Sequence, residues 1–180
     1  MLLDILTPAR ILFGPGANDR FGAEVNRLGK KPLIVTGRQS LVASGNLDRI
    51  VTPLRQQSIK PIFFSDVAPE PTVETVDELR KIARENQCDL VVGVGGGSVL
   101  DAAKAAAGLI NEEEPTRVYL YGREITTSGL PWLAVPTTAG SGSEVTENAV
   151  LVDQKGNKKG SIRNEHWLAA TAIVDPIFTM

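Results

Sequence analysis

The segment from Asp89 to Ile110, DLVVGVGGGSVLDAAKAAAGLI, constrains the fold most strongly because its periodicity changes in the middle. The unbroken apolar run from Leu90 to Val94 is typical of a parallel strand that is buried on both faces. Three glycines follow, and from Val99 the chain is rich in alanine, which predicts a helix with Ser98 as its N-cap. The segment is therefore predicted to pass from a buried strand through a glycine turn into a helix.

This turn predicts an anion site. Without Cβ atoms, three successive glycines can take left-handed dihedrals and let a ligand approach their N–H groups. The first N–H groups of the helix have no partner within it, and the helix dipole favours a phosphate there. In the alternative, purely structural interpretation the glycines only form a tight turn and Asp101 pairs with Lys104 on one helix face. Three adjacent glycines are more than such a turn requires.

Neither of two general phosphate motifs fits this segment. A P-loop ends in Gly-Lys-Ser/Thr, and that triplet does not occur in the chain. The fingerprint GxGxxG is met only as Gly93, Gly95 and then Ser98, after a late strand and without the fingerprint's own ribose-binding acid about 20 residues on.

The rest of the chain alternates short apolar strands with amphipathic helices. Strands are expected at 9–13 (an edge strand), 33–36, 62–64, 132–135 and 172–174. Asn46 and Thr72 are expected to cap helices, and residues 145–152 and 159–162 are expected to form a hairpin. This predicts one α/β domain, residues 1–180, with a largely parallel sheet and helices on both faces.

Composition excludes several classes of partner. The net charge is −2 and there is no lysine or arginine cluster, which argues against nucleic acid or an anionic membrane as a partner and favours a small molecule. The amino terminus lacks the features of a signal peptide, and the single cysteine, Cys88, fits a reducing compartment, so a cytoplasmic protein is expected. One histidine, His166, cannot build a His-rich metal site.

Two segments carry a family resemblance. GGGSVLDAAK (95–104) resembles the GGGSxxDxAK signature of the iron-containing, group III, alcohol dehydrogenases, and PTTAGSGSEVT (136–146) resembles that family's second signature. Family members have a Rossmann-like dinucleotide-binding domain followed by a helical domain whose Asp and His side chains hold the metal. This chain ends before such a ligand motif. The resemblance therefore implies the cofactor-binding half of an NAD(P)-dependent alcohol dehydrogenase.

The resemblance also implies roles for individual residues. The pyrophosphate of the cofactor is expected to be held by Gly95, Gly96, Gly97 and Ser98. The residues expected to support this turn are Asp101 and Lys104. The side chains expected to line the cofactor site are Thr137, Thr138 and Ser141, although the residues alone equally fit a structural loop. Lys159 matches a lysine that contacts the cofactor ribose; Lys158 leaves the register open by one, and two adjacent lysines equally fit a solvated edge.

The end of the strand at 33–36 bears on the choice of dinucleotide. Family members that use NAD often have an Asp directly after a strand motif like LIVT, and here that position is Gly37. Arg38 could bind a 2′-phosphate in two-pronged fashion, with Ser40 as a further donor, or could simply be solvated. This predicts NADP(H) over NAD(H), by ~1–3 kcal/mol if the charge-assisted hydrogen bonds form.

The resemblance implies a small alcohol or carbonyl substrate and a divalent metal, iron or zinc, only together with the helical domain. No residue of this chain is expected to be catalytic or to bind metal, so the chain alone is expected to bind cofactor without turning over an alcohol. A homodimer is left open. Two alternatives are a stand-alone nucleotide-binding or regulatory module and a fragment of a glycerol dehydrogenase-like enzyme, whose second signature differs.

Overall fold

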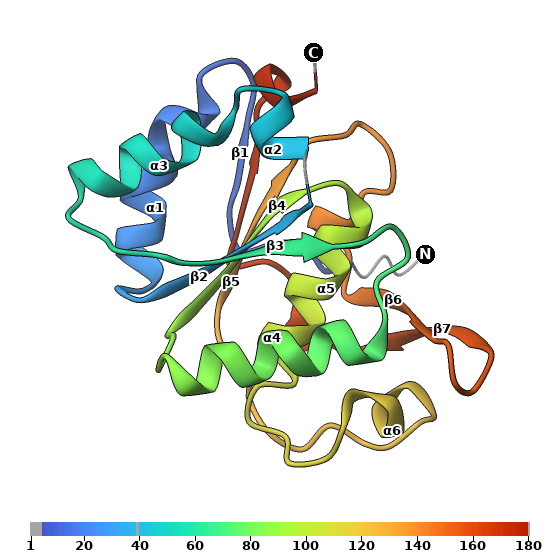
Figure 1. Cartoon of the computed structure of the whole chain (residues 1–180). Coiled ribbons are helices and arrows are strands. Elements are labelled where there is room, and N and C mark those ends of the chain that lie inside the picture. Colours follow the sequence, from blue (N-terminus) through green and yellow to red (C-terminus); the bar gives the residue numbers. More distant parts are fainter. Residues whose placement is uncertain (1–4, 39, 180) are drawn as a thin grey trace.

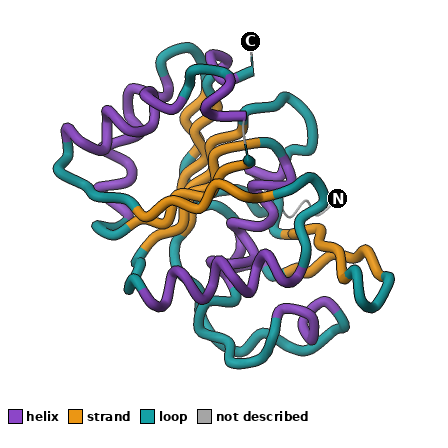
Figure 2. The backbone as a smooth tube through the Cα atoms, in the orientation of Figure 1, coloured by secondary structure: helices purple, strands orange, loops and turns teal. Residues whose placement is uncertain are grey.

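The centre of the molecule is a six-stranded sheet with the order β1-β8-β5-β4-β2-β3 (Figures 1 and 2). All five strand pairings are parallel. The computed structural model describes residues 5–38 and 40–179 and leaves out the side chains at 40 and 42. The strands of the sheet are β1 Ile11–Phe13, β2 Pro32–Gly37, β3 Ile62–Val67, β4 Leu90–Gly95, β5 Trp132–Pro136 and β8 Thr171–Val174.

Helices cover both faces of this sheet. The α-helices are α1 Phe21–Leu28, α2 Ser40–Ala43, α3 Leu47–Gln56, α4 Val73–Glu85, α5 Gly97–Gly108 and α6 Thr116–Leu120. Short 3-10 turns are η1 Ala17–Arg20, η2 Ser143–Val145, η3 Glu165–Trp167 and η4 Pro176–Phe178. α1 and α3 lie on one face, and α4 and α5 lie on the other (Figure 1).

The strand period of two explains the two cores. Leu33 and Val35 of β2 point into the core beneath α4 and α5, whereas Ile34 between them points into the core beneath α1 and α3. All three are completely buried. A central parallel strand therefore has no polar face, which is why its sequence is apolar throughout.

α5 packs unusually close to the sheet because its residues and those beneath it are small. Its alanines are buried all round, and a Cβ on Gly93 of β4 would come within 3.0 Å of the Ala103 Cβ and 3.2 Å of a Leu100 methyl. Glycine in the strand and alanine in the helix together allow this approach. The close packing fixes the position of the α5 amino terminus at the end of β4.

A second, two-stranded sheet stands beside α5. β6 Asn148–Asp153 and β7 Lys158–Arg163 pair antiparallel, with Leu151 opposite Gly160. The Val152 N–H donates to the Pro71 carbonyl at 3.0 Å, so the hairpin is attached to the loop between β3 and α4. This places the β6–β7 hairpin next to the carboxyl edge of the main sheet (Figure 1).

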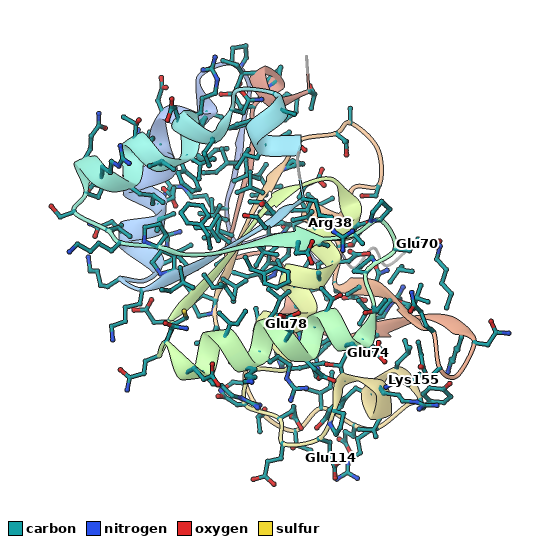
Figure 3. The ribbon with its side chains drawn as sticks, viewed as in Figure 1. Arg38, Glu70, Glu74, Glu78, Glu114 and Lys155 are labelled. Atoms are coloured by element: carbon teal, nitrogen blue, oxygen red, sulfur yellow. The ribbon has the colours of Figure 1, made fainter. Side chains whose placement is uncertain are left out.

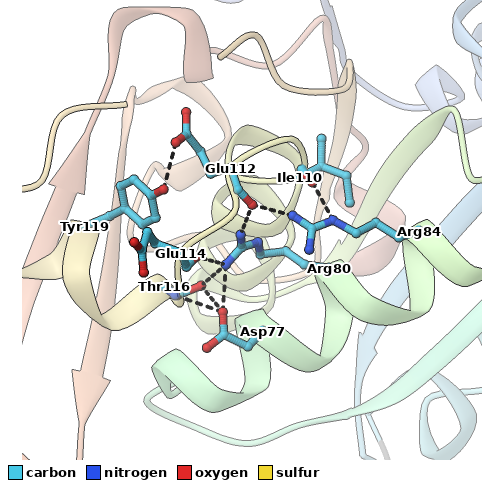
Figure 4. A network of polar contacts seen from close by, with 8 residues as sticks. All are labelled: Asp77, Arg80, Arg84, Ile110, Glu112, Glu114, Thr116 and Tyr119. Atoms are coloured by element: carbon cyan, nitrogen blue, oxygen red, sulfur yellow. Dashed lines mark hydrogen bonds and ion pairs between the residues drawn. The ribbon is translucent and has the colours of Figure 1, made fainter. Parts of the chain in front are cut away.

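Polar side chains join α4 to the segment 110–127 (Figure 4). Arg80 Nη1 donates to Asp77 Oδ1 at 2.8 Å, and the guanidinium groups of Arg80 and Arg84 both donate to the Glu112 carbonyl. Tyr119 Oη donates to Glu112 Oε2 at 2.7 Å. We refer to these residues and Thr116 as the Arg80–Glu112 network. It tethers a long irregular segment that has little hydrophobic periodicity of its own.

The predicted α/β architecture is confirmed, including the edge strand, the Thr72 cap and the hairpin. Thr72 Oγ1 accepts from the Thr75 N–H at 3.1 Å. Asn46 stands at the start of α3, but no side-chain cap bond forms there. The hairpin begins later than expected because residues 143–145 form a 3-10 turn, and α6 was not predicted. None of the helices in the described ranges is long and apolar enough to cross a membrane.

Ser98 is not the N-cap of α5, which corrects the sequence prediction. The capping residue is Gly96, no side chain caps the helix, and Ser98 lies in the first helical turn. Its Oγ instead accepts from the Glu70 N–H at 3.3 Å. The helix begins two residues earlier than predicted because Gly97 is already its first residue, while Gly96, with extended backbone, takes the cap position.

Candidate functional site

The order of the strands points to one place where a ligand would bind. From β2 the chain moves outward to β3, then returns to the other side of β2 as β4 and continues in the opposite direction to β5. The connections leaving β2 and β4 therefore diverge at their carboxyl ends, and open parallel sheets bind ligands at such a switch point. Here it lies between Gly37, which ends β2, and the glycine turn after β4.

A cleft of ≈ 390 Å³ occupies this position. Its lining comes from the ends of β2, β3 and β4, from the first turn of α5 and from the loop after β5. The lining residues are Gly37, Arg38, Val67, Ala68, Pro69, Gly96, Gly97, Ser98, Val99 and Thr138. We call it the switch-point cleft. Six residues predicted for the cofactor site, from three segments that are distant in sequence, are thus brought together.

The glycine turn is shaped by the absence of Cβ atoms and not by left-handed backbone. None of Gly95, Gly96 and Gly97 has a positive φ, which corrects the expectation of left-handed dihedrals. Gly96 has φ −75° and ψ −178°, a conformation open to most residues. A Cβ on Gly97 would lie 2.5 Å from Ser141 Oγ, and one on Gly96 would lie 3.2 Å from Thr138 Oγ1. The glycines therefore leave room for the loop after β5, which we call the second loop, and keep backbone N–H groups accessible from the cleft.

The α5 amino terminus supplies the electrostatics of the cleft. The N–H groups of Gly97 and Ser98 belong to the first helical turn, where no carbonyl lies four residues earlier in the helix to accept from them. The helix dipole adds partial positive charge at the same point. This end of the cleft is therefore suited to a phosphate or pyrophosphate group.

The loop after β5 closes over the glycine turn. The Thr137 N–H donates to the Gly95 carbonyl at 3.0 Å, which extends the β4–β5 pairing into the loop. Thr138 and Ser141 are exposed at the turn's surface, where their hydroxyls stand nearest the positions that Cβ atoms of Gly96 and Gly97 would take. All three predicted loop residues thus lie near the turn, while only Thr138 lines the cleft itself.

Asp101 and Lys104 support this second loop and the hairpin, not the glycine turn directly. Lys104 Nζ, completely buried, donates to the carbonyls of Ser143 at 2.9 Å and Asn148 at 2.7 Å. Asp101 accepts from the Ser143 hydroxyl and from the Val150 N–H. Desolvation by burial lowers the pKa of Lys104 to about 8, although Asp101 favours its charged form. The pair thus attaches α5 to two segments far away in sequence.

Arg38 is the cation at the β2 end of the cleft, and it has a partner. Its guanidinium donates to the Asp66 carboxylate in an ion pair, and both side chains are largely exposed, at 66% and 62%. Gly37 is the register partner of Val67, so Asp66 stands one residue from the end of β2 in the neighbouring strand. The side chain of Ser40, predicted as a further donor, lies outside the described residues.

The two adjacent lysines of the hairpin point to opposite sides. Lys159 Nζ lies 2.7 Å from Glu70 Oε1, on the side of the β3–α4 loop. Lys158 Nζ lies 4.1 Å from the centre of the Tyr121 ring and donates to the Leu120 carbonyl. Only Lys159 therefore faces the loop that borders the cleft, which agrees with the register given by the resemblance. Because adjacent residues of a β-strand point to opposite faces, Lys158 and Lys159 of β7 contact different parts of the chain.

Asp66 and Glu70 are the charged groups at this edge that the sequence interpretation missed (Figure 3 labels Arg38 and Glu70). Both follow the apolar part of β3, so their position in the sequence could have predicted that they lie at the edge of the sheet where ligands bind. Their partners, Arg38 and Lys159, lie 28 and 89 residues away in sequence, so the pairings were not readable.

A second hollow, of ≈ 370 Å³, lies at the other end of α5, between Gly108, Gly129 and Trp167. It faces the carboxyl end of the helix, where the dipole disfavours a phosphate. The described residues also fit a metal poorly: they hold no group of three or more His, Cys, Asp or Glu side chains placed to share an ion. His166 is 81% exposed at its side chain. The switch-point cleft therefore remains the candidate site.

A family model and curated relatives match almost the whole chain. The model of iron-containing alcohol dehydrogenases matches residues 8–176. Long-chain-alcohol dehydrogenase 1 of Geobacillus thermodenitrificans is 40% identical over 184 residues, which cover 97% of this chain and 46% of that protein. The chain spans about half the length of the curated relatives it matches.

Solved structures agree in fold. NADH-dependent butanol dehydrogenase A from Thermotoga maritima superposes with a TM-score of 0.90 at 30% identity, covering 97% of this chain and 44% of that one. Sulfoacetaldehyde reductase from Bifidobacterium kashiwanohense, solved in complex with NAD+, gives 0.87 at 35% identity, covering 99% and 47%. Both matches cover almost all of this chain and about half of the other protein.

Proposed function

Because the chain belongs to the iron-containing alcohol dehydrogenase family, we propose that residues 1–180 form the dinucleotide-binding half of a metal-dependent alcohol dehydrogenase. The complete enzyme would interconvert a small alcohol and an aldehyde or ketone. The observation that carries the proposal is the coincidence of three features at one switch point: a sheet crevice, a glycine turn and the open amino terminus of a helix. The hollow at the carboxyl end of α5 does not combine them.

The residues of this chain would hold the cofactor and not carry out the chemistry. The N–H groups of the turn, Gly96 to Ser98, would bind the pyrophosphate, and Thr138 would cover it from the β5 side. Asp101 and Lys104 would keep the second loop in place through Ser143. Arg38 and Lys159 would lie near the two ribose-bearing ends. When bound, the nicotinamide supplies a hydride acceptor or donor.

The cofactor class is a nicotinamide dinucleotide, and the finer preference for NADP(H) stays a prediction. It depended on the missing acid at Gly37 and on a free Arg38. Arg38 is ion-paired with Asp66, so a 2′-phosphate would have to compete with a carboxylate for the guanidinium. The relatives named above include one NADH-dependent enzyme and one structure with NAD+.

The proposal also holds that the chain alone binds cofactor without turning over an alcohol. The described residues hold no group of three or more His, Cys, Asp or Glu side chains placed to share a metal ion. A stand-alone nucleotide-binding module would bind equally well, and the two possibilities are distinguished only by testing alcohol turnover in the presence of a metal-binding domain of this family. A dimer and a cytoplasmic location stay predictions.

Isothermal titration calorimetry of the purified chain with NAD+, NADH and NADP+ tests the proposal. We expect saturable one-to-one binding of at least one dinucleotide, competed by ADP-ribose, and no oxidation of ethanol or 1-butanol in the presence of iron or zinc. Failure to bind any dinucleotide would refute cofactor binding. Turnover by the isolated chain at a rate typical of enzymes, on the order of 1 s⁻¹ or more, would refute the division of roles.

A further inference from the structure

The β3–α4 loop and the end of β3 place two carboxylates beside the two cations that border the switch-point cleft. Asp66 pairs with Arg38, and Glu70 pairs with Lys159. The acids come from one short segment, whereas the cations come from β2 and β7. Each cation that could attract an extra phosphate is thus already neutralised by the same segment of chain.

Asp66 is distant from Gly37 in sequence but lies beside it at the same edge of the sheet. Dinucleotide-binding sheets often place an acid at the end of an early strand, where it accepts from the adenosine ribose and repels a 2′-phosphate. Gly37 cannot do so in this chain. Val67 is the register partner of Gly37, so Asp66 reaches the same edge from the neighbouring strand. Arg38, its ion-pair partner, and Val67 both line the cleft.

We propose that Asp66 is a cofactor-selectivity residue, which neutralises Arg38 and thereby weakens binding of a 2′-phosphorylated dinucleotide relative to the unphosphorylated one. This inference rests on the proposed dinucleotide function of the cleft. It assigns selectivity to a pair of side chains on two strands, in place of a single acid after β2.

The physical reason is charge balance at an exposed rim. Since both side chains are more than half exposed, the ion pair contributes little to folding and can open without unfolding anything. A 2′-phosphate, which carries about −1.5 to −2 charges, can use the Arg38 fork only by displacing Asp66, whose carboxylate then remains close by as a like charge. A ribose 2′-hydroxyl meets no such repulsion and can donate to the carboxylate.

Exchanging Asp66 for asparagine tests this inference because it keeps the shape and removes the charge. Calorimetric titration with NAD+ and NADP+ at matched, low ionic strength gives the ratio of the two dissociation constants. We expect Asp66→Asn to shift this ratio towards NADP+ by on the order of tenfold, or 1.4 kcal/mol. Asp48→Asn, the same exchange at an exposed position of α3, should leave the ratio unchanged.

A double variant separates neutralisation of Arg38 from other effects of Asp66. In Arg38→Ala/Asp66→Asn the shift towards NADP+ should be mostly lost, because no guanidinium is left to be released. An unchanged ratio in Asp66→Asn, with both cofactors binding, would overturn this inference and leave the dinucleotide function intact. A shift that persists undiminished without Arg38 would overturn the neutralisation. If neither cofactor binds the unaltered chain, the proposed function and this inference fall together.

Discussion

The switch-point cleft and the Arg80–Glu112 network both concentrate charge, but they treat it in opposite ways. In the network, Arg80 and Glu112 are buried, and each has several hydrogen-bond partners: Glu112 alone accepts from Tyr119, Thr126 and Thr127. At the cleft, the pairs Arg38–Asp66 and Lys159–Glu70 are exposed and have few partners. Removing a partner from a buried, hydrogen-bonded charge costs much free energy, whereas opening an exposed ion pair costs little.

Because of this difference, we expect the network to determine the stability of the fold and the cleft pairs to determine ligand binding. Burial raises the pKa of Glu112, but hydrogen bonds from Tyr119 and from Thr126 and Thr127 outweigh it and hold that pKa at about 2. Burial and the neighbouring Glu112 also raise the pKa of Tyr119. At the cleft, exposed pairs keep charge available for exchange with a ligand. We therefore expect network variants to change the free energy of unfolding and cleft variants to change cofactor affinity, with little overlap.

The largest effect is expected from Glu112→Ala, which removes the carboxylate from the network, keeps the carbonyl that accepts from Arg80 and Arg84, and does not touch the cleft. It leaves the Tyr119 hydroxyl and the N–H groups of Thr126 and Thr127 without their acceptor, so the free energy of unfolding should fall by about 3 kcal/mol or more. Urea unfolding followed by circular dichroism measures this. Glu113→Ala, one residue along and exposed, is the matched control and should change stability by less than about 0.5 kcal/mol.

Lowering the pH should remove the stabilisation by the Glu112 carboxylate in the unaltered protein. Glu112 has a pKa of about 2 in the folded chain and an ordinary value of 4.5 in the unfolded chain, so the ionised carboxylate contributes its full stabilisation above pH 4.5. That stabilisation is lost as the pH falls from 4.5 towards 2, and we expect it to amount to about 3 kcal/mol. Measured over this range, the stability difference between the unaltered chain and Glu112→Gln should shrink. A difference that stays constant would show that the Glu112 charge is not the source.

Gly96→Val should weaken dinucleotide binding in the cleft without disturbing the Arg80–Glu112 network. Its backbone dihedrals suit valine, and the nearest atom to the new Cβ is the Thr138 hydroxyl at 3.2 Å, so the fold should survive. The branched side chain would occupy the approach to the turn's N–H groups, and dinucleotide affinity should fall at least tenfold, about 1.4 kcal/mol. Gly140→Val offers a control, since a Cβ there meets nothing within 4 Å. Equal calorimetric affinity of Gly96→Val and the unaltered chain would contradict the role of the turn.

How far the sequence predicts each region follows from the same comparison. Strands β2, β4 and β5 were predictable because a buried parallel strand has an apolar run, and Thr72 because capping is local. The glycine turn and the loop of Thr138 and Ser141 were predictable as two motifs. That they meet was expected only from the family resemblance, since strand order is not written in the spacing of residues.

The network and the ion pairs of the cleft were not predictable for a physical reason. Arg80 and Glu112, or Arg38 and Asp66, look like ordinary surface charges in sequence, and only the packing of α4 on α5 or of β3 on β2 brings them together. Ser98 was wrongly predicted as the cap because a serine before an alanine-rich segment resembles one, whereas the helix already begins at Gly97 and Gly96 takes the cap position. Lys104 was correctly paired with Asp101, but its role in holding Ser143 and Asn148 was visible only in the structure.

The central claim is that a dinucleotide binds at the switch point between β2 and β4. Amide NMR spectra of the ¹⁵N-labelled chain, recorded during titration with NAD+, test it residue by residue. The largest shift changes should fall on Gly37, Gly96, Gly97, Ser98 and Thr138, with Glu112 and Gly129 unaffected. Shift changes centred instead on Gly129 and Trp167, at the opposite end of α5, or no changes at saturating NAD+, would contradict the claim.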